Sequence, residues 1–127
     1  MNLEIPNSLN TPVNKVVLNY LKPLSCHGDN IRPLIEILEN YPEVQSFCPN
    51  GAEYKYVFYY VNRVIFAFGA GMRNISIKVP EEQQDYAKST GAVQIRDAGK
   101  DWYEWDFQSE YIPEFIEFAH QDAIELN

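Results

Sequence analysis

The sequence predicts an α+β fold, in which an antiparallel meander sheet of about five strands carries N-terminal and C-terminal helices packed on one face. Apolar residues recur at helical spacing near both ends of the chain, whereas they alternate with polar residues in its middle. Prolines and glycines separate these segments. The length of 127 residues suits one domain, so we expect residues 1–127 to form a single α+β domain, with residues 1–10 flexible.

Helical spacing predicts a first helix over residues 12–21, with Thr11 as its N-cap and Pro12 at its first position. Its expected core-facing residues are Val13, Val16, Val17, Tyr20 and Leu21. A second helix is expected over 32–40 and a short one over 81–89. The closing helix begins near Pro113, with its glutamates on a solvated face opposite the apolar one.

The expected strands group into two hairpins and a single strand. Residues 54–60 and 64–68 are rich in aromatic and β-branched residues and predict a hairpin buried on both faces at its centre. Residues 75–79 alternate cleanly between apolar and polar. Residues 93–96 and 102–107 flank a short loop and predict the second hairpin.

This order of elements over about residues 54–125 resembles the small α+β domains of the MmcQ/YjbR family, in which a strand meander precedes a tryptophan-bearing hairpin and a closing helix. The resemblance is one of element order. It implies the fold and carries over no residue and no function.

The formal charge of −8 is unevenly distributed along the chain. Residues 79–127 hold twelve acidic and three basic side chains, whereas residues 1–78 hold six and seven. Such a chain repels phosphate backbones, so we expect no nucleic-acid partner. The sequence has neither a signal peptide nor an apolar run of about 18 residues, which favours a cytoplasmic protein without membrane association.

Strand parity singles out one group of residues in the acidic segment. Trp102, Glu104 and Asp106 share one face of the strand 102–107, while Tyr103 and Trp105 point to the other. We assign Trp105 to the core and expect Trp102 to be partly exposed, because burial beside two carboxylates would desolvate their charges. An exposed indole beside two acids is suited to binding Arg or Lys side chains. The alternative is an ordinary solvated strand face with cross-strand ion pairs to Arg96, or one covered by the aliphatic stems of Lys78 and Arg96.

Three other patterns favour ordinary structure over chemistry. The Gly69-Ala70-Gly71 segment lacks the third glycine and following helix of a phosphate-binding loop. Cys26, His27 and Cys48 lack the paired spacing of metal ligands, so no metal and no cofactor are expected. His120 borders the apolar stripe of the last helix, where a hydrogen-bonded structural histidine is favoured over a catalytic base.

These observations favour a non-catalytic binding protein whose acidic, aromatic face recognises a basic protein partner, in an inhibitor, immunity-type or adaptor role. The expected binding residues are Trp102, Glu104, Asp106, Arg73 and Tyr59. One alternative is a small-molecule-binding domain or hydrolase, with a tyrosine-lined pocket containing Arg73 and His120. Another is a homodimer with no separate ligand.

Overall fold

A computed structural model describes residues 5–21, 36, 38–47, 57–69 and 74–126. Six strands form one antiparallel sheet in the order β1-β2-β3-β4-β6-β5. The strands are β1 (Gln45–Phe47), β2 (Val57–Val61), β3 (Val64–Gly69), β4 (Asn74–Lys78), β5 (Val93–Gln94) and β6 (Trp102–Asp106). The helices are η1 (Asn7–Leu9), α1 (Pro12–Leu21), η3 (Glu81–Gln83), α3 (Gln84–Ser89) and α4 (Ile112–Glu125).

The α+β class and the antiparallel sheet are confirmed, with one strand more than expected. The added strand is β1, whose three residues are too few to show an alternating pattern. Of the second expected helix, Glu36 and Leu38 are helical and most of the remainder lies outside the described residues. The second hairpin is also confirmed, but β6 occupies the inner position beside β4 and β5 forms the edge of the sheet.

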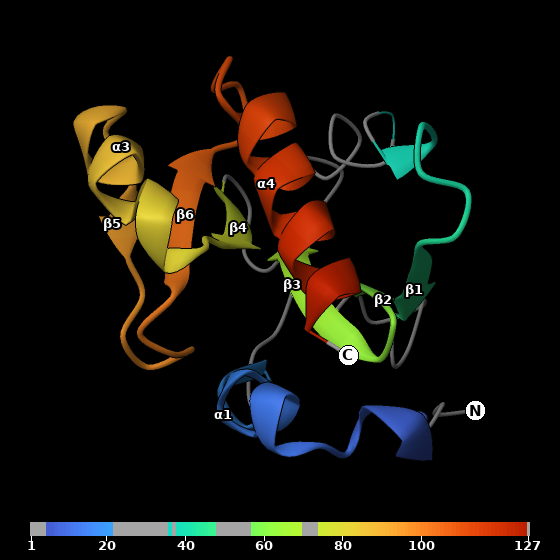
Figure 1. Cartoon of the computed structure of the whole chain (residues 1–127). Helices are drawn as coiled ribbons and strands as arrows, with labels where there is room; N and C mark the ends of the chain where they lie inside the picture. The colour runs from blue at the N-terminus through green and yellow to red at the C-terminus, as the bar shows by residue number, and fades with distance from the viewer. Residues whose placement is uncertain (1–4, 22–35, 37, 48–56, 70–73, 127) are drawn as a thin grey trace.

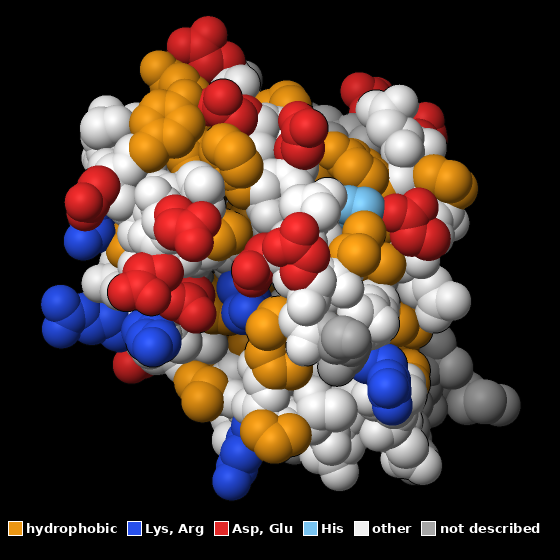
Figure 2. Space-filling view, in the orientation of Figure 1, with side chains coloured by type: hydrophobic (Ala, Val, Ile, Leu, Met, Phe, Trp, Pro, Cys, Tyr) orange, Lys and Arg blue, Asp and Glu red, His pale blue; other side chains and the backbone are white. Residues whose placement is uncertain are grey.

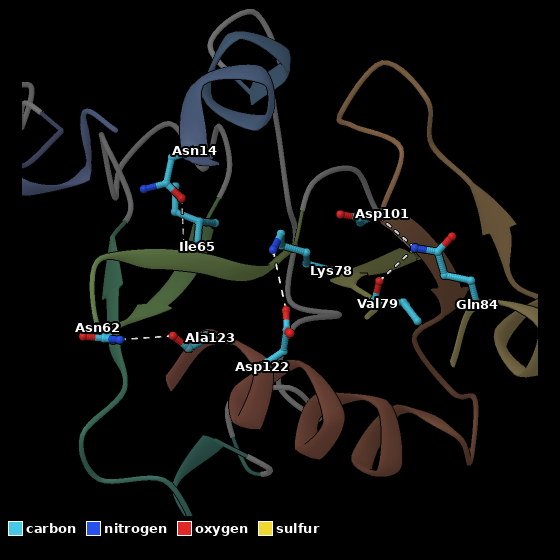
Figure 3. A network of polar contacts seen from close by, with 9 residues as sticks. All are labelled: Asn14, Asn62, Ile65, Lys78, Val79, Gln84, Asp101, Asp122 and Ala123. Carbon is cyan, nitrogen blue, oxygen red and sulfur yellow. Dashed lines mark hydrogen bonds and ion pairs between the residues drawn. The ribbon is translucent and has the colours of Figure 1, made fainter. Parts of the chain in front are cut away.

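The expectation that both terminal helices pack on one face is wrong. One core cluster contains residues of α4, and a second contains residues of α1 on the opposite face of the sheet. In Figure 3 the central strands run between these two helices. The sequence contains the reason, because β3 is buried along its whole length and a strand buried on both faces needs a layer on each side.

Neighbouring strand residues mostly fall into opposite core clusters, but a register shift in the β2–β3 pairing places both Phe66 and Ala67 on the α4 side. The α4 side collects Val57, Tyr59, Val64, Phe66, Ile75, Ile77, Tyr103 and Trp105, against Ile112, Phe115, Ile116, Ala119 and Ala123. The α1 side collects Phe58, Ile65, Phe68 and Trp102, against Leu9, Val17, Leu18 and Leu21. In Figure 1 the α4 helix lies across the sheet, and α1 lies near the C-terminal end of α4.

Asn14 fixes the orientation of α1. Its side chain is fully buried, and its Oδ1 accepts a hydrogen bond from the backbone N–H of Ile65 at 2.9 Å. Its Nδ2 donates to the carbonyls of Leu9 at 2.9 Å and Arg63 at 3.0 Å. Thr11, the expected N-cap, instead has a buried hydroxyl without a hydrogen-bond partner in the described part of the chain. Turning Asn14 inward leaves Val13 and Val16 outside, 40% and 52% exposed, contrary to their expected place in the core.

The turn between β2 and β3 is tied to the other layer as well. Asn62 and Arg63 both have positive φ angles, of 53° and 62°, as a tight type I′ hairpin turn requires. The Asn62 Nδ2 donates to the carbonyls of Ala123 at 3.2 Å and Ile124 at 3.1 Å, at the end of α4. Side-chain amides therefore connect this one turn to α1 on one face and to α4 on the other.

Replacing Asn14 with Ala should lower the free energy of unfolding by about 3 kcal/mol, because the buried N–H of Ile65 and two carbonyls would lose their partner. Urea unfolding followed by tryptophan fluorescence measures this change. The exposed Asn19 on the same helix provides the control, and Asn19→Ala should change stability by no more than about 0.5 kcal/mol. Equal losses in the two variants would contradict the role given to Asn14.

Candidate functional site

The α4 helix is flanked by two hollows in the molecular surface. The larger has a volume of about 920 Å³ and lies at the N-terminal end of the helix. Its lining combines apolar side chains (Tyr41, Phe107, Ile112 and Pro113) with polar ones (Glu36, Asn40, Gln108, Ser109, Glu110, Glu114 and Glu117). The smaller, of about 340 Å³, is lined by Pro80, Glu82, Gln83, Glu114, Glu117, Phe118, Gln121, Asp122 and Glu125.

Both hollows are acidic, and Glu114 and Glu117 belong to both. Four acids line the larger and five the smaller, which makes seven different carboxylates, and among the described residues neither lining includes a lysine or arginine. We call these seven residues and the helix that carries most of them the acidic α4 face. In Figure 2 acidic side chains gather over α4 and α3, with hydrophobic side chains between them. The one ion pair made by these acids within the described residues joins Asp122 to Lys78 at 3.8 Å.

The helix holds its acids close together despite their repulsion. Ile112 and Pro113 begin α4, and Glu114 follows in the first turn, where the helix dipole favours a negative charge. Glu117 lies one turn later, and like charges at this spacing cost a few tenths of a kcal/mol. Both side chains are exposed. The arrangement therefore concentrates negative potential at the rim shared by the two hollows.

Tyr86 connects α3 to this face. Its hydroxyl donates a hydrogen bond to Glu114, and this bond, with burial and the charge of Glu114, raises the pKa of Tyr86 to about 12. The Tyr86 ring lies 5.1 Å from that of Phe115 and 6.3 Å from that of Tyr111, measured between centroids. The phenol is 40% exposed. An amphipathic aromatic side chain thus lies beside a carboxylate, as in many protein contact surfaces.

His120 is buried next to the site and packs against residues that line it. It is 8% exposed, with its ring 4.4 Å from Tyr41 and 6.1 Å from Phe66. Its Nε2 is hydrogen-bonded to the Glu43 carboxylate, which holds the residues around Tyr41 against α4. A backbone hydrogen bond and the contact with His120 lower the pKa of Glu43. The expectation of a hydrogen-bonded structural histidine therefore agrees with the geometry.

The predicted parity of β6 is confirmed, but the expected exposure of Trp102 is wrong. Trp102 belongs to the α1-side cluster, while Tyr103 and Trp105 belong to the α4-side cluster. The Trp102 indole is only 3% exposed, and its ring centroid lies 5.0 Å from that of Phe68 in a tilted arrangement. Gly99, with φ of +139°, passes so close that a Cβ there would lie 3.0 Å from Trp102 Cδ1. Trp102 is buried because α1 covers this face of β6, whereas the sequence alone led us to expect the face to be exposed to solvent.

The two acids that share this strand face have different surroundings. Glu104 is half-buried, and this burial raises its pKa. Its charge also helps to raise the pKa of Tyr20 on α1, after the larger effect of burial. Asp106 is exposed and accepts a hydrogen bond from the Gln108 N–H at 3.0 Å. Both lie on the α1 side of β6, away from the acidic α4 face.

Of the remaining expected binding residues, the structure describes Tyr59 but not Arg73. Tyr59 is 6% exposed and lies in the core under α4. Arg73, Cys26, His27 and Cys48 lie outside the described residues, as does most of the glycine segment. Among the residues that the structure describes, no three His, Cys, Asp or Glu side chains are placed to hold a metal ion. No helix in that same part of the chain is long and apolar enough to cross a membrane.

The sequence did contain a signal for the acidic α4 face. Glu110, Glu114 and Glu117 follow one another at helical spacing without a basic residue between them, whereas a merely solvated helix commonly pairs Glu with Lys one turn away. The aromatic walls could not be foreseen, because Tyr41 and Phe107 are brought to α4 by the tertiary fold.

No family model, curated protein or solved structure matches this chain. The likeness in element order to the MmcQ/YjbR domains therefore adds nothing to the assignment of a site.

The lowered pKa of Glu43 predicts a specific pH dependence. A carboxyl whose pKa is lower in the folded state stabilises the fold above its unfolded value of about 4.5, and this contribution is lost as pH falls through the folded pKa. Glu43→Gln should therefore lower Tm at about pH 5.5, and the difference from wild type should shrink toward about pH 3. Glu39→Gln, at an exposed glutamate nearby, is the control. A Glu43→Gln effect that stays constant over this range would contradict the assignment.

Proposed function

We propose that this chain is a cytosolic, non-catalytic binding protein that recognises a basic segment of a partner protein through its acidic α4 face. The observation that carries the proposal is the pair of hollows that share Glu114 and Glu117 and whose described lining holds seven acids and no base. Complementary charge steers such partners together and selects against acidic ones.

The apolar walls of the larger hollow provide a packing surface for apolar side chains of a partner, in addition to the charge. Tyr41, Phe107 and Ile112 line it beside three glutamates of the chain's last third. Phe107 and Tyr41 are partly buried and packed against the core, so they form a firm surface. An aliphatic side chain or the stem of an arginine can pack on these rings while its charged end meets a carboxylate. The site thus fits a segment that combines Arg or Lys with large apolar residues.

The proposed partner is still the basic protein expected from the sequence, but the proposed binding surface is the acidic α4 face and not the face of β6. The α1 side of β6 offers Glu104 and Asp106 but no exposed indole, since Trp102 is buried. The small-molecule alternative has less support, because His120 is buried and bonded to Glu43 and Tyr59 is a core residue. The acidic α4 face, in contrast, combines a hollow with an excess of negative charge.

A pull-down from native lysate tests the proposal with two variants of equal charge change. The double variant Glu114→Gln with Glu117→Gln should reduce the amount of basic partner protein that is pulled down roughly five-fold. The reason is that exposed ion pairs contribute about 0.2–1 kcal/mol each to binding. Glu104→Gln with Asp106→Asn removes the same two charges from the other face and should leave capture unchanged. Wild-type capture should also fall steeply between about 50 and 500 mM salt.

The outcomes separate the alternatives. Capture that does not change with salt would contradict recognition by charge. Loss of capture only in the β6 variant would move the site to Glu104 and Asp106. A defined peptide that alternates Arg and Leu, measured by fluorescence polarisation with the same variants, removes the dependence on lysate composition.

A further inference from the structure

A second surface differs in character from the acidic α4 face. The described part of the chain has six large hydrophobic side chains that are at least 40% exposed, and four lie on α1 or at the end of α4. These four are Val13 (40%), Val16 (52%), Ile124 (42%) and Leu126 (47%). We call them, with the hollow described next, the apolar end of the molecule.

A hollow of about 360 Å³ joins the two helices at this end. Its lining comes from α1, from the β2–β3 turn and from the residue after α4, namely Thr11, Pro12, Val13, Arg63, Val64 and Leu126. Figure 1 shows α1 near the C-terminal end of α4, and Figure 2 shows hydrophobic side chains over this part of the surface. Val13 and Leu126 line this hollow together, and Val16 lies one turn after Val13 on the same side of α1, so these three exposed side chains form one patch. Ile124, two residues before Leu126, faces another side of the end of α4.

The exposure of this patch is imposed by the fold. The three hydrogen bonds of Asn14 determine which side of α1 faces the sheet, so the helix cannot rotate to bury Val13 and Val16. A helix at the surface of a monomer normally turns polar residues outward. Here a polar residue faces inward and two valines face outward, which is the pattern of a helix that is covered on both sides.

We propose that a second copy of this chain covers the apolar end, forming a two-fold symmetric dimer. The distribution of charge selects this occupant. Two chains of net charge −8 repel each other, but residues 5–21 contain Lys15 and no acid, and Arg63 lines the hollow. Glu125 lies between Ile124 and Leu126. In a symmetric contact each copy therefore brings both signs of charge around an apolar centre, as a self-complementary interface requires.

The dimer leaves the larger acidic hollow open. Ten residues of helix separate Glu114 from Ile124, which corresponds to about 15 Å along the axis. Of the seven acids, the proposed contact involves only Glu125, at the edge of the smaller hollow, so the larger hollow with Glu114 and Glu117 stays accessible in each copy. The inference does not depend on the proposed function, and either can fail without the other.

Sedimentation velocity from about 1 to 200 μM tests the dimer. Wild type should approach twice its mass of 14.7 kDa at the high end and dissociate on dilution. Val16→Asp should weaken the association at least ten-fold, because it would bring two carboxylates into an apolar contact. Val93→Asp is the matched control, since Val93 is 60% exposed on the edge strand β5.

A wild-type mass of 14.7 kDa at the highest concentration would overturn the proposal. A dimer that survives Val16→Asp but is lost in Val93→Asp would place the contact at the sheet edge and also overturn it. Circular dichroism and urea unfolding must show that the Val16 variant is folded. If the Val16 variant is unfolded, Leu126→Asp gives the same test, because Leu126 lines the same hollow from the end of α4.

Discussion

The turn at Asn62 and Arg63 is the point on which the arrangement of both helical layers depends. Asn14 in α1 accepts a hydrogen bond from Ile65 and donates one to the carbonyl of Arg63, while Asn62 donates to the last carbonyls of α4. A buried amide that satisfies three backbone groups is costly to remove, so it imposes a single orientation on its helix. The two layers are thereby fixed relative to each other through one tight hairpin.

The apolar end and the acidic α4 face both follow from this constraint. Fixing α1 leaves Val13 and Val16 exposed and creates the apolar end. Fixing the end of α4 determines which side of that helix meets the sheet, and so which side presents Glu114 and Glu117. The two surfaces differ in chemistry, since one is apolar with charges of both signs around it and the other is acidic around aromatic walls. The larger acidic hollow and the apolar end lie at opposite ends of α4.

Local patterns predicted the elements well and their layers poorly. The bounds of α1 match the expected 12–21. Aromatic and β-branched composition located β3, alternation located β4 and the short flanking loop located β6, because these signals depend on neighbours within a few residues. Which face of the sheet a helix covers depends on contacts between distant residues, such as Asn14 with Ile65. The same limit explains Trp102, since parity gave its face but only the position of α1 shows that this face is buried. The acids of α4 were predicted as solvated, whereas Tyr41 and Phe107, brought there from elsewhere in the chain, turn that face into a candidate site.

The central claim, that the acidic α4 face is where a basic segment binds, can be tested most directly by mapping contacts residue by residue. The measurement is a titration of ¹⁵N-labelled protein with a peptide that alternates Arg and Leu, followed by backbone chemical-shift changes. The account predicts the largest changes at Tyr41, at Phe107 and over residues 110–122, which line the two hollows or lie between their lining residues. Changes centred on Glu104 and Tyr20, on the opposite side of the sheet, or no saturable changes at low salt, would contradict it.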